Sequence, residues 1–168
     1  MRLQLSQLGM HGCVNILLSS VNASINNSVG YVRNADKFGR PDVWEAADIG
    51  GTGDCKAIAL GKQIRLSAAG FETALCTVAT PSGDGHCVLC VRDGNEWWVL
   101  DNLTNDILPP SSTPYKWYLT QKGKSWYYLY WLSFFGITYK VSLIKAPSPP
   151  GWEEYLQREM QSNLQSNK

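Results

Sequence analysis

The chain has 168 residues, of which 44% are hydrophobic and 17% are charged, and its formal net charge at pH 7 is +1. This composition excludes a disordered chain and predicts one globular domain spanning residues 1–168 with a sizeable core. The near-zero charge argues against nucleic-acid binding and against electrostatic attraction to an acidic membrane surface.

Neither a leader nor a membrane span is expected. The first twenty residues lack the unbroken apolar stretch of a signal peptide, so we expect a protein that stays in the cytoplasm of the producing cell. Residues 125–139 carry no charge, but this stretch is too short to cross a bilayer as a helix, and we expect no membrane insertion.

The first half of the chain predicts two helices. Apolar residues recur at three- and four-residue steps from residue 14 to residue 33, which is typical of an amphipathic helix. After a turn-rich stretch, a second helix is expected from residue 54 to residue 69, with Asp54 as its N-cap and Gly70 just beyond its end. Its buried face is predicted to consist of Ala57, Leu60, Gly61, Ile64 and Ala68, with Lys62 among the residues on the rest of the helix.

The second half predicts a sheet. Strands are expected at residues 73–79, 86–92 and 96–103, with two further strands within 126–135 and 137–144. A loop is expected at 109–114 and a short polar helix at 152–163. Helices that precede most of the strands indicate the α+β class.

Four of the five cysteines are expected to be small buried apolar residues: Cys13, Cys76, Cys87 and Cys90. Cys87 and Cys90 form a C-x-x-C motif, but residues three apart on a strand point to opposite faces of the sheet. We therefore predict no metal site at this pair and no metal or other cofactor in the chain.

The fifth cysteine belongs to a constellation typical of thiol catalysis. Cys55 falls in the first turn of the second predicted helix, where unpaired amides and the helix dipole favour a thiolate. His86 follows 31 residues later and Asp101 a further 15. A nucleophile, a general base and an acid that orients the base are what a Cys-His-Asp triad requires, and the Cys55 amide can help to bind an oxyanion.

The hairpin that joins the strands of His86 and Asp101 predicts how these two residues meet. If Asp93-Gly94 forms a two-residue turn, His86 stands directly opposite Asp101 on the neighbouring strand. A three-residue loop would place Asn102 opposite His86 instead. The preference of Asp-Gly for two-residue turns favours Asp101.

These motifs resemble those of the bacterial transglutaminase-like cysteine proteinases, whose periplasmic members release surface adhesins. The resemblance covers residues 21 to 107, about half of the chain. It rests on Val21-Asn22, Tyr31, Asp42-Val43-Trp44, Gly53-Asp54-Cys55, Ala69-Gly70, Gly85-His86-Cys87-Val88-Leu89 and Val99-Leu100-Asp101-Asn102-Leu103. It implies a papain- or transglutaminase-like fold, with a nucleophile helix on an antiparallel sheet, and a catalytic triad of Cys55, His86 and Asp101.

The chain departs from this family's pattern directly after the cysteine. In the adhesin-releasing members, Glu-Asp follows Gly-Asp-Cys, and an acidic residue there joins the preceding aspartate at calcium. Here the following pair is Lys56-Ala57, and a lysine cannot ligate calcium, so the resemblance does not carry calcium dependence over. Trp44 is a candidate for substrate binding in the cleft, or alternatively anchors the loop before the helix.

The leading hypothesis is a cysteine peptidase that cleaves a protein or peptide through a thioester intermediate. Acyl transfer or amide hydrolysis would use the same three groups. From a different class, the chain could be a non-catalytic virion component that keeps the fold for binding, since short versions without a signal peptide occur among phage proteins. A phage origin would imply virion or tail proteins as partners and a virion-associated location.

Overall fold

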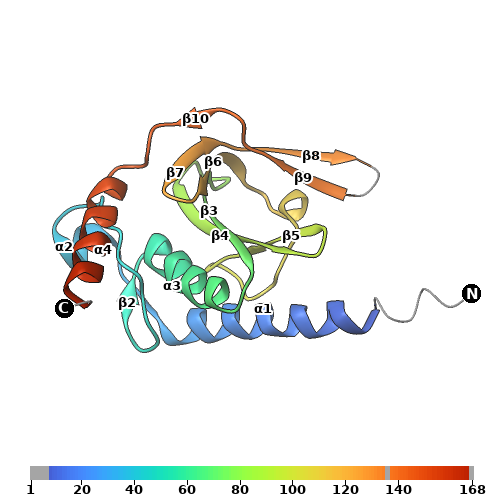
Figure 1. The fold of residues 1–168 in the computed structure, drawn as a ribbon, viewed down its shortest axis with the longest axis horizontal. Helices are drawn as coiled ribbons and strands as arrows, with labels where there is room; N and C mark the ends of the chain where they lie inside the picture. Colours follow the sequence, from blue (N-terminus) through green and yellow to red (C-terminus); the bar gives the residue numbers. More distant parts are fainter. Residues whose placement is uncertain (1–7, 135–136, 167–168) are drawn as a thin grey trace, which may run out of the picture.

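This computed structural model describes residues 8–134 and 137–166. Its centre is a six-stranded antiparallel sheet (Figure 1). Its strands are β3 (Glu72–Ala79), β4 (Gly85–Asp93), β5 (Glu96–Leu100), β6 (Lys116–Lys122), β7 (Ser125–Tyr128) and β10 (Lys145–Ala146). Their order across the sheet is β10-β7-β6-β3-β4-β5. The strands β3 and β4 are both interior strands, and β3 is paired with β4 along its whole length, from Glu72 with Arg92 to Ala79 with Gly85.

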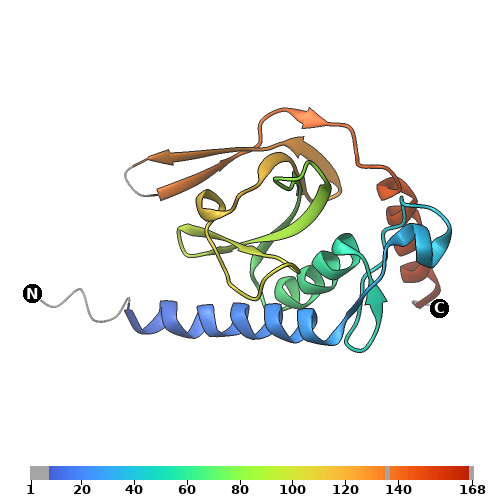
Figure 2. The same cartoon turned by 180° about the vertical axis from the view of Figure 1, so that it is seen from behind.

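Helices cover one face of this sheet. The helix α3 (Cys55–Ala68) packs on β3 and β4, and α1 (Leu8–Ser28) runs alongside α3 (Figure 2). The apolar core between helices and sheet includes Leu18, Leu60, Leu66, Leu75, Leu89 and Leu100. This arrangement confirms the predicted α+β class and the predicted helix on an antiparallel sheet.

The opposite face of the sheet is covered by a separate hairpin of β8 (Tyr130–Phe134) and β9 (Ile137–Val141), which lies against β5. A second core forms on this face, built around Cys76, Val78, Val88, Cys90, Trp97, Val99 and Leu129. Cys87 belongs to the helix-side core and Cys90 to the hairpin-side core, which confirms that the two thiols of the C-x-x-C motif point to opposite faces.

The remaining elements lie at the ends of the sheet. They are β1 (Gly30–Tyr31), α2 (Asn34–Phe38), β2 (Thr52–Gly53), the 3-10 turn η1 (Pro110–Ser112) and α4 (Trp152–Ser166). The helix α4 lies beside α2 at one end of the molecule (Figure 1). Its Trp152 packs edge-on against Trp44 and Trp126, which holds the chain just before α4 close to the start of α3. In the described part of the chain, no helix combines the length and apolar character needed to cross a membrane.

The predicted ends of α3 are confirmed, but its predicted buried face is partly wrong. Asp54 caps the helix by accepting a hydrogen bond from the Ala57 amide, and Gly70 follows it with a positive φ of 91°. However, Ile64 is 52% exposed and Ala68 is exposed as well, whereas Lys62 is fully buried. The helix α3 is covered on two sides, by the sheet and by α1. A single apolar stripe predicts only one covered side, so it does not predict the burial of Lys62.

Other boundaries also needed correction. The first helix begins earlier than predicted, at Leu8, and ends at Ser28. The strand β6 was not predicted, although it occupies the middle of the sheet between β7 and β3. The predicted strand at 126–135 is divided between β7 and β8, which belong to different sheets, and η1 lies within the predicted loop at 109–114.

Candidate active site

Cys55 is the first residue of α3 and lines a cleft. The tight packing before it depends on Gly53, because a Cβ atom there would come within 2.5 Å of the Ala57 Cβ. The strand β2, which contains Gly53, pairs in parallel with β1, and this pairing places the chain that leads into the helix. The sequence Gly-Asp-Cys thus provides a close approach, a helix cap and a thiol at the helix N-terminus.

His86 and Asp101 meet in the structure, although not by the predicted register. The pairs of β4 with β5 run from Asp93–Glu96 to Leu89–Leu100, so the two-residue turn is Gly94-Asn95 rather than Asp93-Gly94. The predicted direct cross-strand pairing is therefore wrong. His86 instead stands beside Val78 of β3, and Asp101 follows the last residue of β5. Their side chains nevertheless bond, with His86 Nε2 2.8 Å from Asp101 Oδ1.

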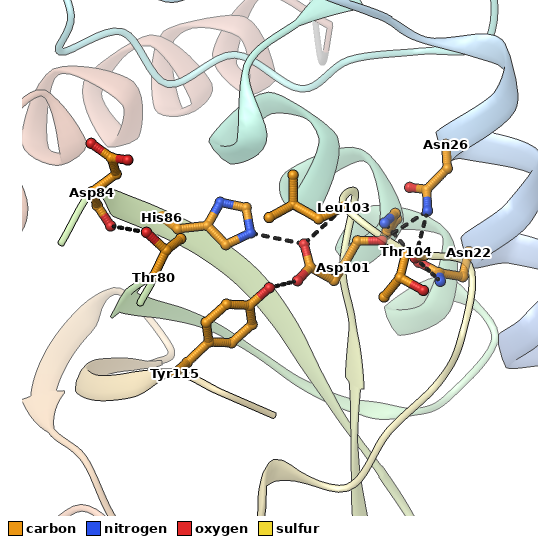
Figure 3. A network of polar contacts seen from close by, with 10 residues as sticks. Asn22, Asn26, Thr80, Asp84, His86, Asp101, Leu103, Thr104 and Tyr115 are labelled. Carbon is orange, nitrogen blue, oxygen red and sulfur yellow. Dashed lines mark hydrogen bonds and ion pairs between the residues drawn. The ribbon is translucent and has the colours of Figure 1, made fainter. Parts of the chain in front are cut away.

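Both carboxylate oxygens of Asp101 are engaged (Figure 3). Oδ1 also accepts a hydrogen bond from the Leu103 amide at 3.1 Å, and Oδ2 accepts one from the Tyr115 hydroxyl. The main chain of Asp101 is fixed separately, because Asn26 of α1 donates its side-chain amide to the Asp101 carbonyl at 2.8 Å. The carboxylate is thus buried, oriented and held from three directions.

The charge distribution favours a protonated imidazole. Burial lowers the pKa of His86, but the hydrogen bonds and negative charges of Asp101 and Cys55 outweigh it and raise that pKa to about 9. Burial likewise raises the pKa of Asp101, and the hydrogen bonds from His86 and Tyr115 reverse this and lower it. Since Nε2 is bonded to Asp101, Nδ1 is the imidazole nitrogen that does not bond the carboxylate, and His86 and Cys55 line the same cleft.

The cleft in front of these groups has a volume of about 480 Å³. Its walls are the start of α3, the edge where β3 turns into β4, part of β6 and the segment before α4; they include Cys55, Val78, His86, Leu119, Pro149 and Pro150. These walls are mainly apolar, and the thiol and the imidazole lie among them. The cleft therefore brings the Cys55 thiol and the His86 imidazole to one surface.

Trp44 contributes to a wall of the cleft, but its side chain is only 1% exposed. Its indole Nε1 donates a hydrogen bond to the Pro150 carbonyl at 3.0 Å, and its ring packs with Trp126 and Trp152. These contacts give Trp44 a clear anchoring role, in which it fixes the Pro149-Pro150 segment as the opposite wall of the cleft.

The residues beside Cys55 do not fit a calcium ion. Asp54 Oδ1 accepts the Ala57 amide, and Asp54 Oδ2 lies 2.7 Å from Lys56 Nζ. The same ammonium group donates to the Pro41 carbonyl at 3.1 Å. Asp54 Oδ2 and the Pro41 carbonyl oxygen, which could bind a hard cation such as calcium, are therefore already bonded to Lys56. Within residues 8–134 and 137–166, no three His, Cys, Asp or Glu side chains converge in a way that could hold a metal ion.

The other described cysteines differ from Cys55 in exposure. Cys76, Cys87 and Cys90 are buried, whereas Cys55 is partly exposed. Burial raises the pKa of Cys87 and that of Cys90 well above the ordinary value, so these thiols are poor nucleophiles. Cys13 lies in α1, where its side chain is outside the described part of the structure.

Two residues that bond Asp101, Tyr115 and Asn26, were not predicted from the sequence. Tyr115 follows a proline-rich stretch with no motif, and only the folded chain brings it to Asp101. Asn26 lies on α1, 75 residues before its partner. A helical position bearing asparagine beside the apolar stripe was the one available signal, because a polar side chain at the edge of a buried face often bonds a neighbouring main chain.

Comparisons with known proteins show the family and the fold of the chain. The family described as bacterial transglutaminase-like cysteine proteinase matches residues 8–134. The calcium-bound structure of Legionella pneumophila LapG is similar, with a TM-score of 0.65 and 22% identity over 87% of this chain and 80% of that one. Another structure of Legionella pneumophila LapG has a TM-score of 0.58 and 25% identity, covering 68% of this chain and 67% of that one. Among curated protein sequences, no significant match was found.

Proposed function

The chain belongs to the bacterial transglutaminase-like cysteine proteinase family and is a cysteine peptidase, and we propose that it cleaves protein substrates through a triad of Cys55, His86 and Asp101. One observation carries this assignment. His86 is bonded at Nε2 to the buried carboxylate of Asp101, and His86 and Cys55 line the same cleft.

In the proposed reaction, the Cys55 thiolate attacks the carbonyl carbon of the scissile peptide bond. The carbonyl oxygen becomes an oxyanion, which the Cys55 amide can stabilise together with the helix dipole. The imidazolium of His86 gives its proton to the leaving amine as the C–N bond breaks, which leaves a thioester on Cys55 and a neutral imidazole.

Water then resolves the thioester. Neutral His86 takes a proton from the water as the water oxygen attacks the carbonyl carbon, and the C–S bond breaks to release the acid and the thiolate. The Asp101 carboxylate stays ionised throughout, because it accepts three hydrogen bonds. Its role is to hold the imidazole in place and to stabilise its positive charge.

A thiol-labelling experiment tests this assignment without knowledge of the natural substrate. Iodoacetamide should alkylate Cys55 at pH 6 much faster than Cys76, Cys87 or Cys90, with sites read by peptide mass spectrometry. His86→Ala should slow labelling of Cys55 at this pH, because the thiolate loses its imidazolium partner. Equal labelling rates for Cys55 in the two proteins would overturn the proposed pairing.

A second measurement addresses the chemistry. Wild-type protein should release labelled peptides from fluorescein-labelled casein, and Cys55→Ala should not. Adding a dansylated primary amine distinguishes hydrolysis from acyl transfer, since transfer would attach the amine to casein at the expense of peptide release.

A further inference from the structure

The hydroxyl of Tyr115 bonds the carboxylate oxygen of Asp101 that His86 does not bond. It donates a hydrogen bond to Oδ2, whereas His86 and the Leu103 amide share Oδ1 (Figure 3). The Asp101 side chain is only 4% exposed, so little water is available to replace a missing donor. A buried carboxylate oxygen without a donor is costly, and the carboxylate would turn to find another partner.

The ring of Tyr115 also touches the imidazole. The centroids of Tyr115 and His86 are 5.6 Å apart and their planes are inclined by 60°, an edge-to-face contact. One side chain therefore contacts both the proposed base and the acid that orients it. Burial and the bonded carboxylate raise the pKa of Tyr115, which keeps its hydroxyl protonated as a donor.

The backbone that carries Tyr115 is well anchored. The preceding turn η1 is stabilised by the Thr113 side chain, which donates to the Pro110 carbonyl at 2.8 Å, and Pro110 itself is buried. Directly after Tyr115 the chain enters β6, which is paired on both sides by β3 and β7. The hydroxyl is thus presented from a fixed position rather than from a free loop.

From these contacts we propose that Tyr115 is a positioning residue of the active site: its hydroxyl fixes the Asp101 carboxylate so that Oδ1 faces the imidazole. This inference rests on the proposed triad. It assigns Tyr115 no contact with substrate and no proton transfer, and it makes the orientation of Asp101 depend on a residue from outside the three-residue motif.

The test is Tyr115→Phe, which removes the hydroxyl and keeps the ring against His86. Loss of one hydrogen bond to a charged group predicts a fall of roughly tenfold in kcat on labelled casein, with KM little changed. A freer carboxylate stabilises the imidazolium less, so the alkaline limb of the pH–rate profile should move to lower pH by roughly 0.5–1 unit. Tyr128→Phe is the matched control, because it removes an exposed hydroxyl on β7, outside the site.

Three outcomes contradict the proposal. An unchanged alkaline limb with a lower thermal midpoint would assign Tyr115 to packing alone. A limb that moves to higher pH would mean that the hydroxyl weakens the Asp101–His86 bond rather than orienting it. A Tyr115→Phe variant with the activity of the wild type would show that the hydroxyl does not position Asp101. Failure of the triad is distinguishable from all three, because Cys55→Ala and Asp101→Ala would then retain the wild-type rate.

Discussion

Lys56 Nζ lies 2.7 Å from Oδ2 of Asp54, so the residues on either side of Cys55 form an ion pair at the start of α3. The Asp54 side chain is 8% exposed and that of Lys56 is 23% exposed, which makes this pair more protected than an ordinary surface salt bridge. It places a fixed positive charge of the protein itself where the family pattern has acidic residues.

This ion pair predicts that calcium has no effect on the protein. Calcium chloride or EGTA should leave both the thermal midpoint and the casein-cleaving rate of the wild type unchanged, because the oxygens of Asp54 are already occupied. Lys56→Glu combined with Ala57→Asp places acidic side chains beside Asp54, and calcium should raise the thermal midpoint of that variant. A lower midpoint of the wild type in EGTA would contradict the prediction.

The second prediction concerns Asp101 and pH. Asp101→Asn keeps the size of the side chain and removes the charge that helps to raise the pKa of His86 to about 9. The folded-state pKa of His86 should therefore fall towards its ordinary value of 6.5, and the alkaline limb of the pH–rate profile should fall with it. Loss of the orienting charge in triads lowers kcat by up to about 10⁴-fold. A profile of unchanged shape would show that Asp101 does not control the imidazole.

The site could be predicted from sequence because its chemistry is encoded locally at each residue. Gly53, Asp54 and Cys55 form a recognisable start of a helix, and the cap that they predict is present. His86 and Asp101 were found by residue type and order, not by register. The observed register of β4 with β5 differs from the predicted one by two residues. The two side chains still bond, because Asp101 follows the end of β5 and its carboxylate reaches His86.

What sequence reasoning missed depends on tertiary structure. The strand β6 contains Lys116, Gln121 and Lys122, which weaken the pattern of a central strand, and it is fixed in the sheet by pairing on both edges. Lys62 was predicted to lie on the rest of its helix, outside the apolar stripe. Only the approach of α1 explains its burial, since Asn22 on that helix accepts a hydrogen bond from Lys62 Nζ at 2.7 Å.

The third prediction concerns the close approach of α3 to the loop before it. A Cβ atom at Gly61 would lie 2.2 Å from the Ala47 carbonyl oxygen, which is main chain and cannot turn aside. The absence of a side chain at Gly61 therefore fits the helix against this loop. Gly61→Ala should lower the free energy of unfolding by about 1–3 kcal/mol, measured by urea denaturation.

A matched substitution separates crowding from a general effect of replacing glycine. A Cβ atom added at Gly85 would have no neighbouring atom within 4 Å, and the φ of Gly85 lies outside the left-handed range. Gly85→Ala should leave the free energy of unfolding nearly unchanged. Equal losses in the two variants would refute the close approach at Gly61.

The last prediction concerns the buried Lys62. Burial lowers its pKa from 10.5 to about 7, and the negative charge of Asp101 opposes this only in part. Between these two pKa values the unfolded chain binds more protons at Lys62 than the folded protein, so the contribution of Lys62 to stability rises with pH.

The variant Lys62→Met removes this titration. The difference in free energy of unfolding, wild type minus variant, should be flat below pH 7 and rise by at most about 1.4 kcal/mol per pH unit up to pH 9. His86 is present in both proteins, and the loss of the donor to Asn22 is a constant offset, so neither alters this slope. Urea denaturation of both proteins at pH 6, 7.5 and 9 measures it, and a difference that stays constant or falls between pH 7.5 and 9 would mean that Lys62 keeps its proton in the folded protein.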